Sequence, residues 1–319
     1  MSKAIIVGSS GQDGIILYDI LEKAGYELIG LDKESIRTNQ NAGLKRSLNI
    51  CDYEDVGSLI TLYKPDEVYH LAAFHHSSEE REIDPGKLWE LSYNVNTSSL
   101  HHFLEAIRLY SPTTRIFYAV SSHIFGIPPN DLQDESTPIN PISLYGITKA
   151  TGLFLCRLYR QMYGIFSSTG ILYNHESAYG SENFITAKII HSAIRIKRAE
   201  QKKLVVGNLN AVADWGYAPD YVNAMKKILK LSEPDDFVIA TGEKHTVREF
   251  IEIVFNEVGL GWENHVEERG DILARQSSVL TGNSNKLRAK TGWKTTVAFE
   301  EMVRSLVSQF SANYEEKKP

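Results

Sequence analysis

Short apolar runs alternate along the first half of the chain with segments whose apolar residues recur at helical spacing. Residues 4–7 are apolar and rich in β-branched side chains, a pattern that predicts a strand. Across residues 15–21 the apolar positions recur with the period of an amphipathic helix. A strand followed closely by a helix is the repeating unit of a parallel sheet, because parallel strands need crossover connections.

More strands and one long helix are predicted in the same half. The strands are Glu27–Leu31, a third ending near Leu48-Asn49-Ile50, residues 67–71 and Arg115–Ser121, and the helix covers residues 88–107. Strands and helices that alternate at this pace are typical of a doubly wound parallel sheet. We therefore expect an α/β fold of the Rossmann type.

The pattern loosens after Asn174. Helices are predicted over residues 184–198, 220–231, 246–258 and 298–310, and a short strand over residues 203–206. We expect residues 1–173 plus about 210–240 to form the Rossmann domain, and about 174–209 plus 241–319 to form a smaller, mixed α/β C-terminal lobe. His245 and His265 are interpreted as surface or packing residues.

Composition narrows the class of protein. The 319 residues are 42% hydrophobic, enough for a large core, and the net charge of −6 argues against a nucleic-acid-binding surface. The chain has neither an apolar run of about 18 residues, which a membrane span needs, nor a signal-peptide layout at its start. Cys51 and Cys156 lie far apart and have no metal-binding spacing, so we expect no metal site and a cytoplasmic protein with reduced thiols.

A glycine-rich turn joins the first strand to the first helix. It contains Gly8, Gly11, Gln12, Asp13 and Gly14. Glycines permit a tight turn and a close approach of the backbone, and the helix N-terminus supplies N–H groups and the positive end of a dipole. A plain turn could carry the same glycines, but the flanking strand and helix favour a cradle for the pyrophosphate of a dinucleotide.

The cofactor expected there is NAD. Asp32 ends the second strand, at the distance from the glycine turn where an acid binds the ribose hydroxyls and repels a 2′-phosphate. Lys33 and Arg37 lie nearby and keep NADP as the alternative. Asn49 and Ile50 are expected beside the adenine.

The strand expected to end at Leu71 runs into two small residues, Ala72 and Ala73, which let a cofactor approach the backbone. His75 and His76 follow on the loop. Paired loop histidines are often solvated, but this loop is expected at the carboxyl edge of the sheet, where ligands bind.

Tyr145 and Lys149 are spaced i and i+4, so they share one face of a helix. An ammonium that close favours the phenolate, and we expect the pKa of Tyr145 to fall below its ordinary value of about 10. Ser121 ends a predicted strand, and a proline-containing loop leads from it to the Tyr145 helix. A tyrosine beside a serine can pass a proton to or from a sugar alcohol or ketone, while a nicotinamide takes the hydride.

In their order and spacing, these motifs resemble those of the extended short-chain dehydrogenase/reductase family. Within that family the chain is similar to the GDP-mannose 4,6-dehydratase branch. The similar segments are Gly11-Gln12-Asp13-Gly14, Asn174-His175-Glu176-Ser177, Glu182-Asn183-Phe184-Ile185-Thr186 with Lys188, Gly207-Asn208-Leu209, Asp214-Trp215-Gly216, Asp220-Tyr221-Val222 and Gly292-Trp293.

The resemblance implies oxidation at C4 of a GDP-sugar, elimination of water across C5 and C6, and reduction at C6. Tyr145, assisted by Lys149 and Ser121, would take the C4 hydroxyl proton. His175 would contact the cofactor, and the smaller lobe would bind the nucleotide sugar. The residues expected at the substrate are His76, Ser122, Asn174, Asn183, Lys188 and Arg275. Family members commonly form homodimers or homotetramers.

The chain departs from the branch in three places. His123 stands where the branch has the glutamate that handles the elimination proton, so either His123 performs the elimination or it packs at the site edge. Without elimination, the enzyme would be a C4 epimerase or a 4-oxidase/reductase acting on a GDP-sugar. Ala213 replaces a phosphate-binding arginine and two further arginines are missing, so either Lys188 and Arg275 hold the phosphates instead or the ligand is altered. Asp32 stands where the branch commonly has an arginine for NADP.

These alternatives leave a third class open, a member that binds nucleotide without turnover and serves as a regulatory subunit. The presence of Ser121, Tyr145 and Lys149 argues against it.

Overall fold

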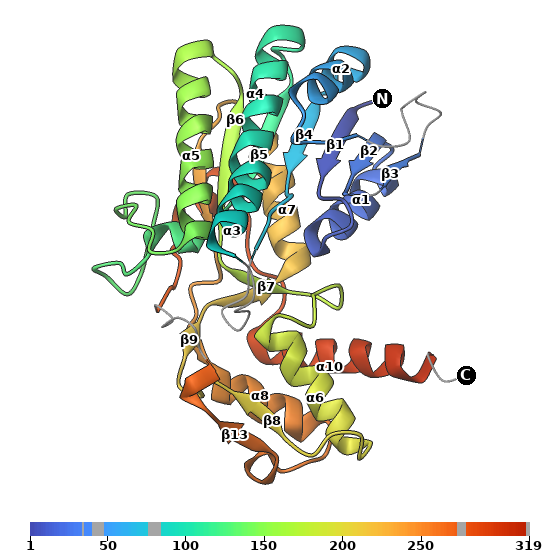
Figure 1. Ribbon diagram of the computed structural model, residues 1–319, viewed down its shortest axis with the longest axis vertical. Helices are drawn as coiled ribbons and strands as arrows, with labels where there is room; N and C mark the ends of the chain where they lie inside the picture. Colours follow the sequence, from blue (N-terminus) through green and yellow to red (C-terminus); the bar gives the residue numbers. More distant parts are fainter. Residues whose placement is uncertain (34, 40–47, 76–83, 273–278, 317–319) are drawn as a thin grey trace.

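The computed structural model describes residues 1–33, 35–39, 48–75, 84–272 and 279–316. Their largest sheet has the strand order β11-β6-β5-β4-β1-β2-β3 (Figure 1). The strands are β1 Lys3–Val7, β2 Glu27–Leu31, β3 Ile36–Thr38, β4 Glu67–His70, β5 Arg115–Ser121, β6 Ser167–Leu172 and β11 Asp236–Ile239. All neighbours pair in parallel except β3, which is antiparallel to β2. The predicted α/β fold of the Rossmann type is confirmed.

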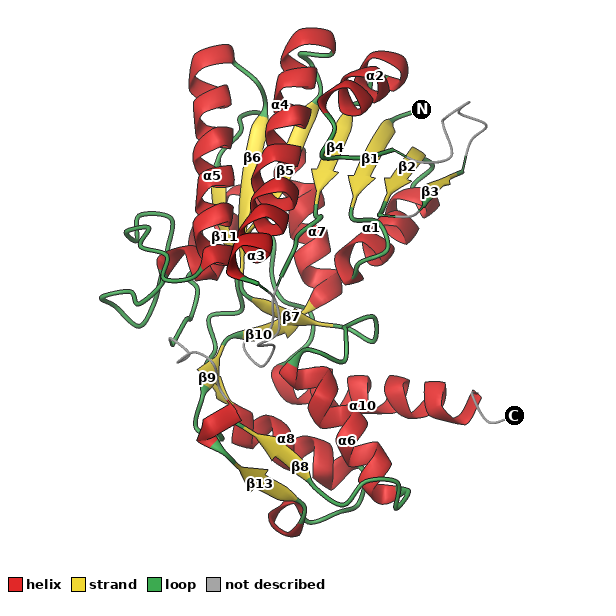
Figure 2. Cartoon of the chain, viewed as in Figure 1, coloured by secondary structure: helices red, strands yellow, loops and turns green. Residues whose placement is uncertain are grey.

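The strand order reverses direction between β1 and β4, which defines the crevice where ligands bind in such sheets. Val7, Leu31 and His70 are partners in register, so these three strands end together. Gly8, Asp32 and Leu71, which follow them, therefore emerge at one edge of the sheet. Figure 2 shows the arrowheads of these strands directed toward β7 and β10.

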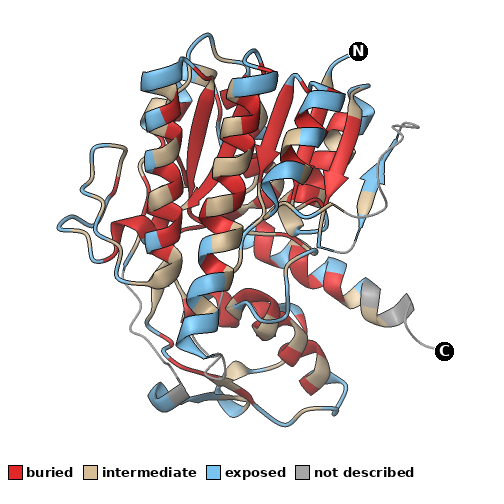
Figure 3. Cartoon of the chain, turned by 45° about the horizontal axis from the view of Figure 1, so that its top comes forward, coloured by how far each residue is buried: buried red, intermediate tan, exposed pale blue. Residues whose placement is uncertain are grey.

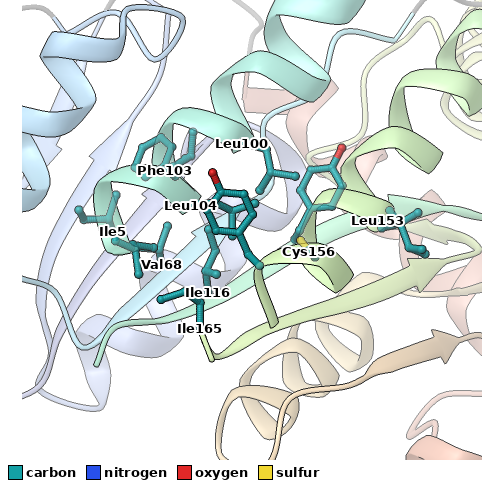
Figure 4. Packing of buried hydrophobic residues seen from close by; sticks show 14 of the residues in the cluster. Ile5, Val68, Leu100, Phe103, Leu104, Ile116, Leu153, Cys156 and Ile165 are labelled. Carbon is teal, nitrogen blue, oxygen red and sulfur yellow. The ribbon is translucent and has the colours of Figure 1, made fainter. Parts of the chain in front are cut away.

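Helices cover both faces of the sheet. The helices are α1 Gln12–Lys23, α2 Tyr53–Tyr63, α3 Pro85–Tyr93, α4 Ser99–Tyr110, α5 Leu144–Tyr163, α6 Ile185–Lys197, α7 Ala218–Leu229, α8 Val247–Glu257, α9 Asn285–Thr291 and α10 Phe299–Glu316. Because side chains alternate along a strand, Ile5 packs with α2, α4 and α5, while Ile6 packs with α1 and α7. The strands are therefore buried on both faces. Figure 3 colours most of these strands as buried, and Figure 4 shows part of the cluster that contains Ile5.

The predicted helix over residues 88–107 is divided in the structure. Between α3 and α4 the residues Asn94–Ser98 form one π-helical turn, η1. There the Asn96 side chain accepts from Phe74 N at 2.8 Å and donates to Thr148 Oγ1 at 3.0 Å, while Tyr118 Oη donates to Asn96 O at 2.7 Å. These buried polar contacts accompany the wider turn and hold it against β5 and α5.

The prediction of a strand ending near Leu48-Asn49-Ile50 is wrong, because these residues lie in a loop and a turn. Asn49 N donates to Asp55 Oδ2 at 3.0 Å, and Cys51 N donates to Asn49 Oδ1 at 3.0 Å, so local side-chain bonds hold the backbone there. The strand beside β2 is β3, a short antiparallel strand whose exposed polar residues carry little sequence signal.

The second half of the chain builds a third apolar cluster, in which α6, α8 and α10 pack together. Its short strands are β7 Asn174–Glu176 with β10 Trp215–Tyr217, β9 Val212–Ala213 with β12 His245–Thr246, and β8 Leu204–Val206 with β13 Val266–Glu268. Three single turns, η2 Ser122–Phe125, η3 Trp262–Asn264 and η4 Gly270–Ile272, complete the described elements. His245 and His265 stack on Phe299 and Phe255, in agreement with a packing role.

Two buried carboxylates join distant segments of the chain. Asp214 accepts from the backbone N–H groups of Thr241, Gly242 and Gly282 and from Thr241 Oγ1. Asp220 accepts from Thr296 N and Oγ1, both at 2.7 Å. These acids of the Asp-Trp-Gly and Asp-Tyr-Val motifs therefore stabilise the fold.

We propose the division into domains expected from the sequence, with one addition. Leu287 in α9 and Trp293 pack in the same cluster as α1 and α7, so α9 belongs with the Rossmann domain. No helix within the described ranges is long and apolar enough to span a membrane.

Candidate active site

A cleft of about 1010 Å³ opens at the carboxyl edge of the sheet. Its walls come from the glycine turn, the ends of β2, β4, β5 and β6, the first turns of α5, and β7. The predicted residues that line it are Gly8, Gly11, Gln12, Asp13, Gly14, Asp32, Asn49, Ile50, Leu71, Ala72, Ala73, Ser121, His123, Tyr145, Lys149, Asn174 and His175. Residues that the sequence places far apart are thus gathered around one space.

The glycine turn is shaped for close backbone approach. Gly8 has φ +89°, in the left-handed region, and a Cβ there would lie 2.7 Å from Ala72 N. A Cβ on Gly14 would overlap the carbonyl oxygen of Gly8. Because α1 begins at Gln12, directly after the turn, its first N–H groups and positive dipole end face the cradle. This geometry fits the pyrophosphate of a dinucleotide.

Asp32 is fixed at the end of β2. Its Oδ2 accepts from Ser10 N at 3.0 Å and its Oδ1 from Lys33 N at 2.8 Å. Arg37 lies elsewhere: its guanidinium stacks on the Tyr18 ring at 3.7 Å and pairs with carboxylates of α1. Lys33 lines the cleft, whereas Arg37 is absent from the lining. The Asp32 carboxylate is therefore better placed than the Arg37 guanidinium to contact a bound ribose.

Lys149 is buried next to Tyr145. Its Nζ donates to Ala119 O at 2.7 Å and lies 5.8 Å from the centroid of the Tyr145 ring. Burial lowers the pKa of Lys149 to about 7.

The prediction that the pKa of Tyr145 falls is wrong. Burial raises the pKa of the phenol to about 12, and a hydrogen bond with the Ser121 side chain acts in the opposite direction. The ammonium is directed at the Ala119 carbonyl and loses its own proton readily, so it does not outweigh burial.

Local contacts place Tyr145 beside the end of β5. Ser143 caps α5, its Oγ accepting from Gly146 N at 3.1 Å, so Tyr145 lies in the first turn. A Cβ on Gly146 would lie 2.6 Å from His123 O, so that turn packs directly on η2. Ser121 Oγ accepts from His123 N at 3.3 Å. Ser121, His123 and Tyr145 therefore share one wall of the cleft.

Two imidazoles contact the Tyr145 ring edge to face. The His75 ring centroid lies 4.8 Å from it and the His123 centroid 5.8 Å. Phe184, the residue before α6, packs on His75 at 5.6 Å. The sequence suggested His75 only as a loop residue near ligands, because its distance from Tyr145 depends on the path of two loops.

The Gly-Gln-Asp-Gly and Asn-His-Glu-Ser motifs contact each other. His175 Nε2 lies 2.9 Å from Asp13 Oδ2, and Gln12 Nε2 donates to His175 O at 2.8 Å. Ser177 Oγ donates to Gln12 Oε1 at 2.8 Å. Burial lowers the pKa of His175, but the Asp13 carboxylate reverses this and the pKa rises to about 9. The imidazole is therefore cationic at neutral pH, beneath the glycine turn.

Some predicted residues are not brought to the cleft. Ser122 is buried and does not line it, and neither Asn183 nor Lys188 does. His76 and Arg275 lie outside the described residues, so their substrate contacts stay predictions. Lining residues that the sequence did not indicate as ligands include Ser10, Cys51, Asp55, Val95, Glu176, Tyr179, Gly180, Ser181 and Phe184. Glu176 and Phe184 lie within motifs that resemble those of the family, and this is the one feature of the sequence that indicates them.

A glycine turn at the reversal of strand order, with Ser121, Tyr145 and Lys149 lining the same cleft, defines an extended short-chain dehydrogenase/reductase. A family model for GDP-mannose 4,6 dehydratase matches residues 5–306. GDP-mannose 4,6 dehydratase 1 of Arabidopsis thaliana is 37% identical to the chain, over 96% of this chain and 89% of the plant protein. The Vibrio cholerae GDP-mannose 4,6-dehydratase is 32% identical, over 96% and 93%. The chain belongs to the GDP-mannose 4,6-dehydratase family.

Solved structures show the same fold. RMD from Pseudomonas aeruginosa, complexed with NADPH, superposes with a TM-score of 0.83 at 18% identity, over 98% of this chain and 100% of that one. dTDP-glucose 4,6-dehydratase from Bacillus anthracis, in complex with NAD, gives 0.81 at 17% identity, over 99% and 98%. The family resemblance and the assignment as an enzyme, both predicted from motifs, are confirmed.

Proposed function

We propose that the chain is an NAD-dependent GDP-hexose 4,6-dehydratase, with GDP-mannose as the first substrate to test. The observation that carries this proposal is that Ser121, His123, Tyr145 and Lys149 line the same cleft as the glycine turn. Its relatives at 32% and 37% identity bear the name GDP-mannose 4,6-dehydratase.

The residues present fit a nicotinamide dinucleotide. The cradle of Gly8, Gly11 and Gly14 would hold the pyrophosphate, the cationic His175 would lie near its charge, and Asp32 would bind the adenosine ribose. When bound, the nicotinamide supplies the acceptor for the C4 hydride and the donor for C6.

The chain's own groups move the protons. Tyr145 takes the proton of the C4 hydroxyl as the phenolate, whose formation burial opposes and the hydrogen bond with Ser121 favours. Lys149 adds positive charge beside the ring when protonated. Once C4 is a ketone, the adjacent C5–H is acidic, and His123 removes that proton as water leaves from C6.

We propose NAD rather than NADP as the cofactor. Asp32 would repel a 2′-phosphate, and Arg37 is engaged with Tyr18 and the acids of α1. Two fold neighbours are named with different cofactors, one with NADPH and one with NAD, so the support for NAD in this chain comes from Asp32 and Arg37.

The second candidate is a C4 epimerase or 4-oxidase/reductase on a GDP-sugar, favoured by His123 in place of the branch's glutamate. Incubating the protein with NAD and GDP-mannose, then a small panel of nucleotide hexoses, separates the two by product mass. Loss of one water supports dehydration. An isomer of unchanged mass supports epimerisation, and loss of two hydrogens with accumulating NADH supports net oxidation.

We also propose that the chain forms a homodimer through α5. Ile147, Phe154, Leu158 and Met162 recur at helical spacing along one stripe of α5, and each is 42–66% exposed. A second copy of the same helix is the natural partner, because a two-fold interface pairs a surface with itself. Light scattering on Phe154→Glu/Leu158→Glu tests this: a monomer supports the interface, and an unchanged dimer contradicts it.

A cytoplasmic location remains part of the proposal. Cys51 and Cys156 are both free thiols, as a reducing compartment favours. Cell fractionation with a tagged full-length chain tests it.

A further inference from the structure

Two histidines from different strand ends lie side by side next to Tyr145. His75 follows β4 and His123 lies in η2 after β5. Their ring centroids are 6.4 Å apart at an interplanar angle of 84°, and both residues line the cleft. The proposed proton chemistry above uses only one of them.

The position of the His75 ring is defined on two sides. The Tyr145 ring meets it edge to face at 4.8 Å, and the Phe184 ring packs on it at 5.6 Å with a tilt of 36°. Aromatic pairs at these separations are favourable contacts. His75 is thus held at the catalytic wall.

Elimination across C5 and C6 needs more than a base at C5. Hydroxide leaves poorly, so the C6 oxygen must be protonated as its bond to carbon breaks, and a positioned acid typically contributes 10²–10⁴-fold. Imidazole titrates near neutral pH and suits either task. C5 and C6 are adjacent atoms, so the base and the acid must lie within a few ångströms of each other, as these two rings do.

We propose that His75 is the general acid for the departing C6 hydroxyl, working with His123 as the base at C5. In this step the C5–H bond breaks and its proton goes to His123. The electron pair is held first as the enolate of the 4-ketone; it then forms the C5–C6 double bond as the C6–O bond breaks, and the oxygen takes a proton from His75 and leaves as water. Solvent then restores the His75 proton. The inference rests on the proposed 4,6-dehydration.

The competing mechanism uses His123 alone, which would carry the C5 proton to the C6 oxygen. The two mechanisms differ in what happens when His75 is replaced. With separate groups, His75→Asn blocks departure of water but leaves removal of the C5 proton intact. With one group, His75→Asn changes neither step.

The test uses the full chain with NAD and GDP-mannose in D₂O. For His75→Asn we expect water loss to slow by about 10²-fold or more, while deuterium still enters C5 of the recovered sugar. His123→Asn should lose both the departure of water and the entry of deuterium at C5. His265→Asn, which alters a histidine stacked on Phe255 in the other lobe, is the matched control and should behave as the unaltered chain.

A substrate with fluorine in place of the C6 hydroxyl distinguishes chemistry from structural damage. Fluoride leaves without needing the same protonation, so GDP-6-deoxy-6-fluoro-mannose should restore elimination by His75→Asn to within a few-fold of the unaltered chain. Normal water loss by His75→Asn, or a defect that fluorine does not relieve, overturns the assignment. If the unaltered chain dehydrates nothing, the proposed function itself fails.

Discussion

His175 Nε2 lies 2.9 Å from Asp13 Oδ2, across 162 positions of sequence. The pair joins the first β–α turn of the Rossmann domain to β7 at the cleft floor. Nδ1 of the same imidazole lies 2.7 Å from Tyr173 O, and the ring stacks on Tyr221 at 4.5 Å. With both nitrogens donating, the ring carries a positive charge, in keeping with a pKa raised to about 9.

Replacing Asp13 with asparagine should remove this coupling. A histidine whose folded-state pKa lies above its ordinary value of 6.5 stabilises the fold fully below that value, and the contribution disappears as pH rises through about 9. We therefore expect the free energy of unfolding to fall over this range by on the order of 3 kcal/mol in the unaltered chain, and by much less in Asp13→Asn.

Urea unfolding at several pH values measures this slope. Asp19→Asn is the matched control, because Asp19 is on the same helix but pairs with the exposed Arg37. Equal slopes for the unaltered chain and Asp13→Asn would mean that the ion pair does not set the charge of His175.

Asp32→Ala should relax cofactor selection. The carboxylate that repels a 2′-phosphate would be gone, so we expect the ratio of kcat/KM for NAD over NADP to fall at least about tenfold. The ratio is measured with one sugar substrate and both cofactors. Tighter binding of NADP than NAD by the unaltered chain would contradict the assigned role.

Asp214→Ala should destabilise the fold without touching the chemistry directly. Three backbone N–H groups and the Thr241 hydroxyl would lose their buried acceptor, at a cost of about 3 kcal/mol or more. Chemical denaturation measures the loss. Asp131→Asn, which alters an exposed acid paired with Lys244, should leave the midpoint nearly unchanged. A midpoint equally unchanged in Asp214→Ala would rule out this structural role.

Four strands of the larger sheet, β1, β2, β4 and β5, could be predicted because each carries an apolar run buried on both faces. β6 Ser167–Leu172 and β11 Asp236–Ile239 were not predicted, although both are buried, because polar residues begin these short runs. Within Arg115–Ser121, residues 116–120 form a continuous apolar run, and the structure places β5 over the predicted range. Ile36–Thr38 was missed because an exposed edge strand has no apolar run. The π turn at Asn94–Ser98 was missed because one extra residue in a turn barely alters the apolar spacing.

The site could be predicted where its residues lie close together in the sequence. The i, i+4 relation brought Lys149 to Tyr145, but the direction of the pKa shift depends on burial, which the whole fold determines. The contact of His75 with Tyr145 depends on two loop paths, and the pairing of Asp13 with His175 on the packing of β7 beneath α1. No local pattern encodes these contacts.

The central claim is that the Tyr145 hydroxyl exchanges the proton at C4 of a nucleotide-activated sugar. The direct test compares the unaltered chain with Tyr145→Phe, using NAD and GDP-mannose and following loss of water by mass spectrometry. We predict a dehydrated product from the unaltered chain and turnover about 10²–10⁴-fold slower for Tyr145→Phe, with the thermal midpoint retained. Undiminished turnover by Tyr145→Phe would contradict the account.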